Sequence, residues 1–276
     1  MAKEKQNKIQ NISILGAGWL GLPLGQRLVE AGKSVRASST RKERLETITK
    51  AGMQAYLLAL ETLEAHHSDF FECDLLFINI PPPRKLPNLV AVYTQWMEKL
   101  LVKISAHKIP YCIFISSTGV YPDLNDTVDE SIAPVPESTS GKALFQSETL
   151  LKNMAGLQCN ILRLAGLVGG SREPGKFLAG KQNLANGDAP VNLVHRADCI
   201  AIICQIINKG IWGETFNICA DKHPSRADFY VAQAKKLTLE PPTFSAERLN
   251  RFKIISNQKI KNSLSYQFQY ADPMDF

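Results

Sequence analysis

The sequence predicts an α/β fold: a doubly wound parallel sheet followed by a smaller C-terminal region. Three observations predict it. A short apolar strand at 11–15 runs into GAGWLG and then into a helical pattern. Strands and amphipathic helices alternate over 11–164, which favours parallel strands with right-handed crossovers. The runs 74–80 (DLLFINI) and 111–116 (YCIFIS) are mostly apolar without alternation, as in strands that helices cover on both faces, and such a sheet is of the Rossmann type.

Each element follows from its local pattern of apolar residues and chain breakers. Gly32 ends the first helix, and Pro81-Pro82-Pro83 stops the fourth strand. We expect strands at 11–15, 34–38, 54–58, 74–80, 111–116 and 159–164, and helices at 19–31, 42–51, 89–107 and 142–154. Beyond Ala165 the pattern loosens, and we expect helices at 196–207 and 226–239 and a strand at 215–219.

The glycines of the first turn suit a dinucleotide pyrophosphate. Gly16 permits a tight turn off the strand, and Gly18 lets the backbone approach the phosphates without an intervening Cβ. Gly21 lets the next helix pack closely, so that its N-terminal amides and dipole point at the anion. The sequence therefore predicts a bound dinucleotide at this turn.

The end of the second strand indicates which dinucleotide is bound. An NAD site usually has an acid there, which accepts from the ribose hydroxyls and repels a 2′-phosphate. Here the strand ends as Ser38-Ser39-Thr40-Arg41-Lys42, with hydroxyls and cations but no acid. We therefore expect NADP rather than NAD.

Composition favours a cytoplasmic protein with a small-molecule partner. The 276 residues are 45% hydrophobic, and no apolar run reaches the roughly 18–20 residues of a membrane span. Six scattered cysteines without Cys-x-x-Cys favour reduced thiols and no metal site. The net charge is +6, but the basic segment 225–261 has no long basic run interleaved with aromatics, so we expect no nucleic-acid partner. The expected domains are a polar leader at 1–10, an NADP-binding domain at 11–165 and an interleaved substrate-binding region at 166–276.

Four segments resemble one family. Ile115-Ser-Ser-Thr-Gly-Val-Tyr121 resembles the Ser-Ser-x-x-Val-Tyr segment of extended short-chain dehydrogenases/reductases, the NAD(P)-dependent sugar epimerase/dehydratase group. The segments 163–170, 192–200 and 213–218 are similar to that group's turn after the sixth strand, its His-x-x-Asp segment and its Gly-x-x-Tyr-Asn-Val strand. The opening Gly-Trp-Leu-Gly-Leu-Pro-Leu and the segment Ser256-Asn257-x-Lys259 look like an atypical branch.

The resemblance implies a catalytic Ser/Thr, Tyr and Lys. The hydroxyl role passes to Ser117, with Thr118 as an alternative, but Ser140 and Leu144 stand where the family has its Tyr and Lys. Ser140 also suits a helix N-cap, and we expect that structural role. The predicted cofactor-binding residues are Gly16, Ala17, Gly18, Trp19, Leu20, Gly21, Ser39, Thr40, Arg41, Ile80, Pro81, Ser116 and Ala165. The predicted substrate-binding residues are Tyr121, Arg172, His195 and Arg196.

Three functions stay open at this point. The first is an NADP-binding atypical reductase or epimerase, monomeric or homodimeric, that acts on a small sugar-nucleotide-like substrate without the family's Tyr and Lys. The second is a non-catalytic NADP-dependent sensor or partner-binding protein, which the loss of both groups suggests. The third is a 6-phosphogluconate-type hydroxyacid dehydrogenase, which shares the Gly-x-Gly-x-x-Gly-x-Pro-like opening and requires an all-helical second half.

Overall fold

The structure is a computed structural model that describes residues 9–63, 69–83, 85–247 and 251–276. The predicted leader at 1–10 lies outside the described residues apart from its last two positions. The chain divides into two units, each built from several segments. Unit 1 comprises 1–116, 137–162 and 203–215, and unit 2 comprises 117–136, 163–202 and 216–276. The expected domain ranges 11–165 and 166–276 stay a prediction.

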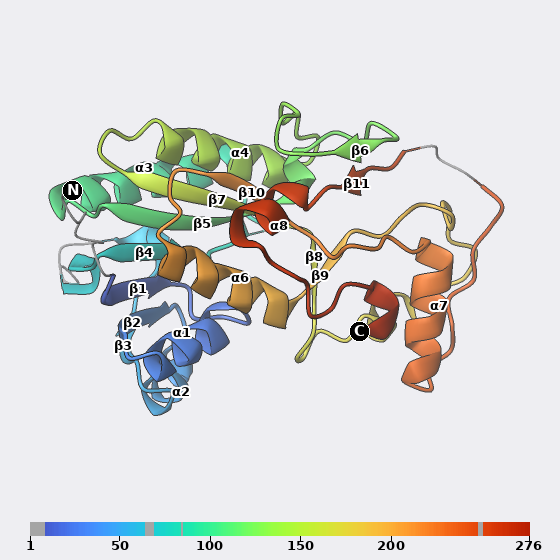
Figure 1. The fold of residues 1–276 in the computed structure, drawn as a ribbon, viewed down its shortest axis with the longest axis horizontal. Helices are drawn as coiled ribbons and strands as arrows, with labels where there is room; N and C mark the ends of the chain where they lie inside the picture. The colour runs from blue at the N-terminus through green and yellow to red at the C-terminus, as the bar shows by residue number, and fades with distance from the viewer. Residues whose placement is uncertain (1–8, 64–68, 84, 248–250) are drawn as a thin grey trace. The chain divides into compact units, whose positions relative to one another are not determined.

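A seven-stranded sheet runs in the order β10-β7-β5-β4-β1-β2-β3 (Figure 1). The pairs β1–β2, β1–β4, β2–β3 and β4–β5 are all parallel. Its strands are β1 (Asn11–Leu15), β2 (Ser34–Ser39), β3 (Gln54–Leu57), β4 (Leu75–Ile78), β5 (Tyr111–Ser117), β7 (Gln158–Leu164) and β10 (Thr215–Ile218). This sheet confirms the predicted Rossmann-type α/β fold.

The strand order reverses between β1 and β4. The chain runs from β1 outward through β2 to β3, then returns to the other side of β1 and continues outward through β4 and β5. The connections after β1 and β4 therefore leave in opposite directions, which opens a crevice beyond the carboxyl ends of these two strands. In open α/β sheets this switch point is where ligands bind.

Helices cover both faces of the sheet. In unit 1, α1 and α2 lie on one side, and α3 and α4 pack side by side on the other (Figure 1). Close packing of α1 needs small residues, because a Cβ at Gly25 would lie 2.2 Å from the Met53 sulfur. The helices are α1 (Gly21–Glu30), α2 (Leu45–Lys50), α3 (Leu89–Ala106), α4 (Thr139–Lys152), α5 (Gly175–Leu178), α6 (Arg196–Lys209), α7 (Arg226–Lys236) and α8 (Gln258–Leu264).

Unit 2 has a core of its own. Two short parallel pairs, β8 (Gly166–Val168) with β9 (Leu193–His195) and β6 (Thr127–Val128) with β11 (Ile254–Ile255), were not expected from the sequence. The core residues are Val168, Val191, Leu193 and Phe229, with Tyr230, Met274 and Phe276 packed against them. The strands β7 to β10 exclude the all-helical second half that a 6-phosphogluconate-type dehydrogenase requires.

Candidate functional site

The glycine turn after β1 has the backbone that the sequence predicts. Gly16 has a φ of +103°, and a Cβ there would lie 2.6 Å from the carbonyl oxygen of Asn79. A Cβ at Gly21 would lie 2.3 Å from the Gly16 carbonyl oxygen, so this position also needs glycine for close packing. Gly18 faces open space, with nothing within 4 Å of an added Cβ. The turn thus leaves room for a ligand at its middle glycine.

Two side chains hold this turn from neighbouring strands. The Gly16 amide donates to the Ser38 hydroxyl at 3.0 Å, and the Asn79 side-chain amide donates to the Gly16 carbonyl at 3.1 Å. The following helix, α1, has no side-chain cap and no acid in its first turn. Its N-terminal amides and positive dipole end are therefore not neutralised by its own side chains, which suits a bound anion.

A cavity of about 220 Å³ lies at the switch point between β1 and β4. It brings together eight of the predicted cofactor residues: Gly16, Ala17, Gly18, Ser39, Thr40, Arg41, Ile80 and Pro81. Ser38, Arg44, Leu58 and Asn79 also line it and were missed. The predicted residues Trp19, Leu20, Gly21, Ser116 and Ala165 are not among its lining residues.

The residues of this cavity fit an NADP adenosine half. None of its lining residues, all in the described part of the chain, is acidic, and two are arginines. Arg41 forms a long, exposed pair with Glu43 at 3.9 Å, which is worth little in water. The Arg44 Nε is buried and has no hydrogen-bond partner among the described residues. An unsatisfied guanidinium N–H beside two hydroxyl side chains is complementary to a phosphate.

The start of α4 corrects the expectation for Ser140. The helix begins at Thr139 rather than 142, and its N-cap is Ser138, whose hydroxyl accepts from the Gly141 amide at 3.0 Å. Ser140 lies in the first turn, 3.4 Å from the Ser138 hydroxyl. The capping role predicted for Ser140 was therefore wrong, because the helix starts three residues before the expected position and its N-cap lies two residues before Ser140. Its predicted catalytic role stays a prediction.

The positions of α4 where the resembled family has its Tyr and Lys hold Ser140 and Leu144 here. Leu144 is buried with 8% of its surface exposed, one turn after Ser140. One turn further, the buried Glu148 accepts a 2.5 Å hydrogen bond from the hydroxyl of Ser116. Ser116 is thus anchored to α4 at the carboxyl end of β5.

The loop after β5 opens unit 2 and carries Ser117, Thr118 and Tyr121. The Ser117 hydroxyl accepts from the Gly119 amide at 3.1 Å, which caps a short 3₁₀ turn, and Thr118 is buried. Tyr121 is 2% exposed, and its hydroxyl donates to Asn217 at 2.9 Å. Burial raises the pKa of Tyr121, so its phenol is neutral at physiological pH. Substrate contact by Tyr121 stays a prediction.

The three remaining substrate candidates gather at one glycine turn in unit 2. Backbone bonds between Gly169 and Arg172 close this turn. The His195 ring lies against Gly169, because a Cβ added there would be 2.3 Å from Nε2. The Arg196 guanidinium lies against Gly170, where an added Cβ would be 2.3 Å from one of its terminal nitrogens. The side chains of His195 and Arg196 thus lie against a turn whose backbone includes Arg172. Ala165, by contrast, is buried, and its amide donates to the Ile218 carbonyl at 3.0 Å.

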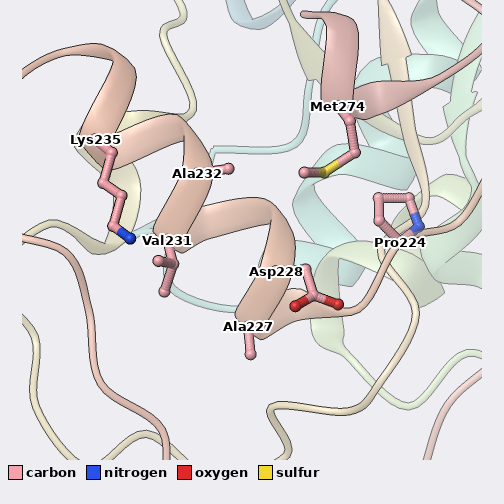
Figure 2. Close-up of a pocket in the computed structure, with 7 residues that line it drawn as sticks. All are labelled: Pro224, Ala227, Asp228, Val231, Ala232, Lys235 and Met274. Carbon is pink, nitrogen blue, oxygen red and sulfur yellow. The ribbon is translucent and has the colours of Figure 1, made fainter.

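A larger cavity of about 610 Å³ lies along α7 in unit 2 (Figure 2). The Met274 side chain points toward the helix there (Figure 2). The residues that line this cavity were not predicted to bind a ligand; they are Pro224, Ala227, Asp228, Val231, Ala232, Lys235 and Met274.

Over the described ranges, no helix is long and apolar enough to cross a membrane, and no three His, Cys, Asp or Glu side chains are grouped to hold a metal.

Comparison with known proteins places the chain among relatives. Residues 11–107 match the family described as "NADP oxidoreductase coenzyme F420-dependent". Among solved structures, UDP-glucuronic acid 4-epimerase from Bacillus cereus, in complex with UDP-glucuronic acid and NAD, is 19% identical with a TM-score of 0.78, covering 96% of each chain. UDP-glucose 4-epimerase from Thermotoga maritima, solved with UDP-glucose, is 17% identical with a TM-score of 0.77, covering 94% of each chain. These structures confirm, for the fold, the resemblance to extended short-chain dehydrogenases/reductases.

A much closer likeness exists to a bacterial protein over nearly the whole length. Protein YeeZ of Escherichia coli is 39% identical over 271 residues, which cover 96% of this chain and 98% of that protein. Identity at this level over a full chain establishes common descent, so this chain belongs to the family of Protein YeeZ.

Proposed function

We propose that this protein is an NADP-dependent reductase or epimerase of the extended short-chain type that acts on a small nucleotide-sugar-like substrate. The observation that carries the proposal is the cavity at the β1–β4 switch point, with its open glycine turn, two arginines and no lining acid. The fold is that of enzymes solved with NAD and nucleotide sugars, which supports the same reaction class.

NADP is favoured over NAD by the charges at the end of β2. A 2′-phosphate there meets the hydroxyls of Ser39 and Thr40 and the guanidinium groups of Arg41 and Arg44. Charge-assisted hydrogen bonds of this kind are about twice as strong as neutral ones. The description of the matching family, which names NADP, agrees with this choice, whereas the solved neighbours were crystallised with NAD.

NADP supplies hydride transfer at its nicotinamide, and the chain supplies orientation of the substrate. Ser117, at the end of β5, is the hydroxyl that the family resemblance assigns to the substrate oxygen, with Thr118 beside it. Because Leu144 replaces the lysine and Ser140 the tyrosine, no phenol on α4 is available to move a proton to that oxygen. The proton for the substrate oxygen then comes from another side chain or from solvent, unless the protein is not catalytic.

The substrate is proposed to carry phosphate. The side chains of His195 and Arg196 lie against the glycine turn to which Arg172 belongs. Basic side chains recognise phosphate oxygens through charge-assisted hydrogen bonds. The neighbouring epimerases were solved with UDP-glucuronic acid and UDP-glucose, substrates with this chemistry. We further propose a cytoplasmic monomer or homodimer with no nucleic-acid or membrane partner.

Two measurements test the proposal. NADPH and NADH are titrated against the purified protein by fluorescence. Turnover is screened in two ways: by the change in NADPH absorbance, with NADPH for simple carbonyl compounds and NADP⁺ for UDP-glucose and UDP-glucuronic acid, and by chromatography for an epimer of either nucleotide sugar, because epimerisation leaves the amount of NADPH unchanged. Tight NADPH binding with turnover that Ser117→Ala abolishes supports the enzyme. Absence of dinucleotide binding overturns the proposal outright.

A non-catalytic NADP sensor is the second candidate, and the burial of Leu144 favours it. A lysine at this position would have to place its ammonium in the apolar site that Leu144 fills at 8% exposure, which is costly without a partner. The α4 face is therefore packed for stability rather than arranged around a charged catalytic pair. Tight NADPH binding without turnover in the screen decides for the sensor.

A further inference from the structure

The ring of His195 packs against aromatic side chains and a glycine turn. Its ring packs on Tyr270 with centroids 3.7 Å apart and on Phe276 with centroids 5.7 Å apart. Both aromatics belong to the C-terminal segment 266–276 and lie 75 and 81 residues after His195 in the chain. Gly169 also lies against the ring, because a Cβ there would be 2.3 Å from Nε2. The imidazole is therefore held between the glycine turn and the C-terminal segment.

One buried carboxylate ties this segment to the start of α6. Asp198 is completely buried and accepts three hydrogen bonds: from the Tyr266 hydroxyl at 2.7 Å, the Gln269 amide at 2.8 Å and the Tyr270 amide at 3.0 Å. A buried carboxylate needs such donors, because losing water without replacing its hydrogen bonds is costly. The bond to Tyr270 sets the backbone from which the stacking ring projects. Asp198 therefore controls the position of the group that covers His195.

The hydrogen bonds of His195 define its tautomer. The Ala197 amide donates to Nδ1 at 3.3 Å, so Nδ1 carries no proton and Nε2 carries it in the neutral ring. Among the described residues, Nε2 has no hydrogen-bond partner. Burial, the largest influence, lowers the pKa of His195; Arg196 lowers it further, and Asp198 opposes both. His195 is thus a neutral imidazole with an unused N–H beside a guanidinium.

We propose that His195 donates its Nε2–H to an oxygen of an anionic, phosphate-bearing substrate that binds to unit 2. The segment 266–276 holds His195 in place for this contact, with Asp198 and Tyr270 as positioning residues. The identity of the substrate class rests on the proposed function, whereas the state of His195 does not. A neutral N–H donor is suited to this task, because it binds a phosphate oxygen while Arg196 supplies the charge.

The state of His195 is tested by NMR on protein labelled with ¹⁵N-histidine. The expected spectrum shows the Nε2–H tautomer at neutral pH and a pKa below the ordinary 6.5. Tyr270→Phe keeps the stacked ring and is expected to leave both unchanged, whereas Tyr270→Ala uncovers the imidazole and is expected to raise its pKa. Tyr266→Phe keeps the Asp198 charge, removes one of its three hydrogen bonds and is expected to move the pKa in the same direction as Tyr270→Ala, but less. Asp198→Asn also removes the negative charge that raises the pKa of His195, so it is not used to test the covering of the ring. A His195 with an ordinary pKa that Tyr270→Ala does not move overturns the proposal.

Binding is tested with uridine diphosphate as the probe, by calorimetry and by the same NMR signals. His195→Gln keeps an N–H donor and is expected to bind nearly as the parent, whereas His195→Phe keeps a ring without a donor and is expected to bind roughly 3–10-fold more weakly. Equal binding by His195→Phe and the parent, or no shift of the Nε2 signal on adding the probe, overturns the donor role. NADPH titration of the same samples separates the two ideas: its failure rejects the proposed function and leaves the His195 measurements standing.

Discussion

Arg163 donates a 2.7 Å hydrogen bond to the hydroxyl of Tyr121, and its guanidinium carbon lies 4.7 Å from the centre of the same ring. The hydroxyl in turn donates to Asn217, and all three side chains are buried. The contact joins the loop after β5 to the ends of β7 and β10. It accounts for the tyrosine of the Ser-Ser-x-x-Val-Tyr segment through packing and hydrogen bonding within unit 2.

Tyr121→Phe is expected to cost about 1–3 kcal/mol of stability, because it removes two buried hydrogen bonds, one from Arg163 and one to Asn217. Urea denaturation measures this loss. NADPH affinity is expected to stay unchanged. If turnover falls while stability is intact, Tyr121 contacts substrate and the structural interpretation is wrong.

Ser138→Ala and Ser140→Ala form a matched pair on one helix. Ser138 caps α4 through the Gly141 amide, so its loss is expected to cost about 0.5–2 kcal/mol. Ser140 makes no such bond to a backbone amide of the described residues, so Ser140→Ala is expected to cost much less stability. Thermal denaturation compares the two. A larger loss for Ser140→Ala contradicts the capping geometry, and loss of turnover in Ser140→Ala with stability intact assigns it a catalytic role.

Arg44→Ala is expected to weaken NADPH binding by about 1–3 kcal/mol and to leave NADH binding nearly unchanged, because only NADPH carries the 2′-phosphate. Arg41→Ala is expected to act in the same direction. Parallel titrations with both dinucleotides measure the two effects. Lys42→Ala, a neighbouring cation that does not line the cavity, is the control. Equal losses for NADPH and NADH would show that the arginines act on structure rather than on the phosphate.

Glu130→Gln is expected to stabilise the protein at pH 7. Burial raises the pKa of Glu130 above its usual value of 4.5, so the folded state binds its proton more tightly than the unfolded chain. The favourable contribution is present below pH 4.5 and is lost as the pH rises through the folded pKa. The backbone amide of Asn217 donates to Glu130 at 2.7 Å. Glutamine keeps an oxygen for this bond and carries no charge. We expect a Tm increase of about 1–3 °C at pH 7 that vanishes at pH 4; an equal shift at both values contradicts the titration argument.

Much of the cavity at the β1–β4 switch point could be predicted from the sequence, because most of its residues lie close together in the chain. Gly16, Gly18 and Gly21 lie within six residues, and the strand, turn and helix that they connect follow one another along the chain. The polar end of β2 was equally visible. Arg44 was missed although it lies three residues after Arg41, because its arrival in the cavity depends on a short 3₁₀ turn at Lys42–Arg44 that precedes α2. Asn79 was missed because nothing in its own segment shows that it reaches back to Gly16.

The sequence by itself determined the sheet, the glycine turn and the absence of a tyrosine at position 140 and of a lysine at position 144, since these depend on neighbouring residues and on periodic patterns. Only the tertiary structure decided that Ser138 rather than Ser140 caps α4, that Tyr121 is bound by Arg163 and Asn217, and that Asp198 holds the segment covering His195. These contacts join positions far apart in the chain or depend on where a helix begins within a turn. Their hydrogen bonds form only after the surrounding core has excluded water, and no local pattern of residues records which partners that packing brings together.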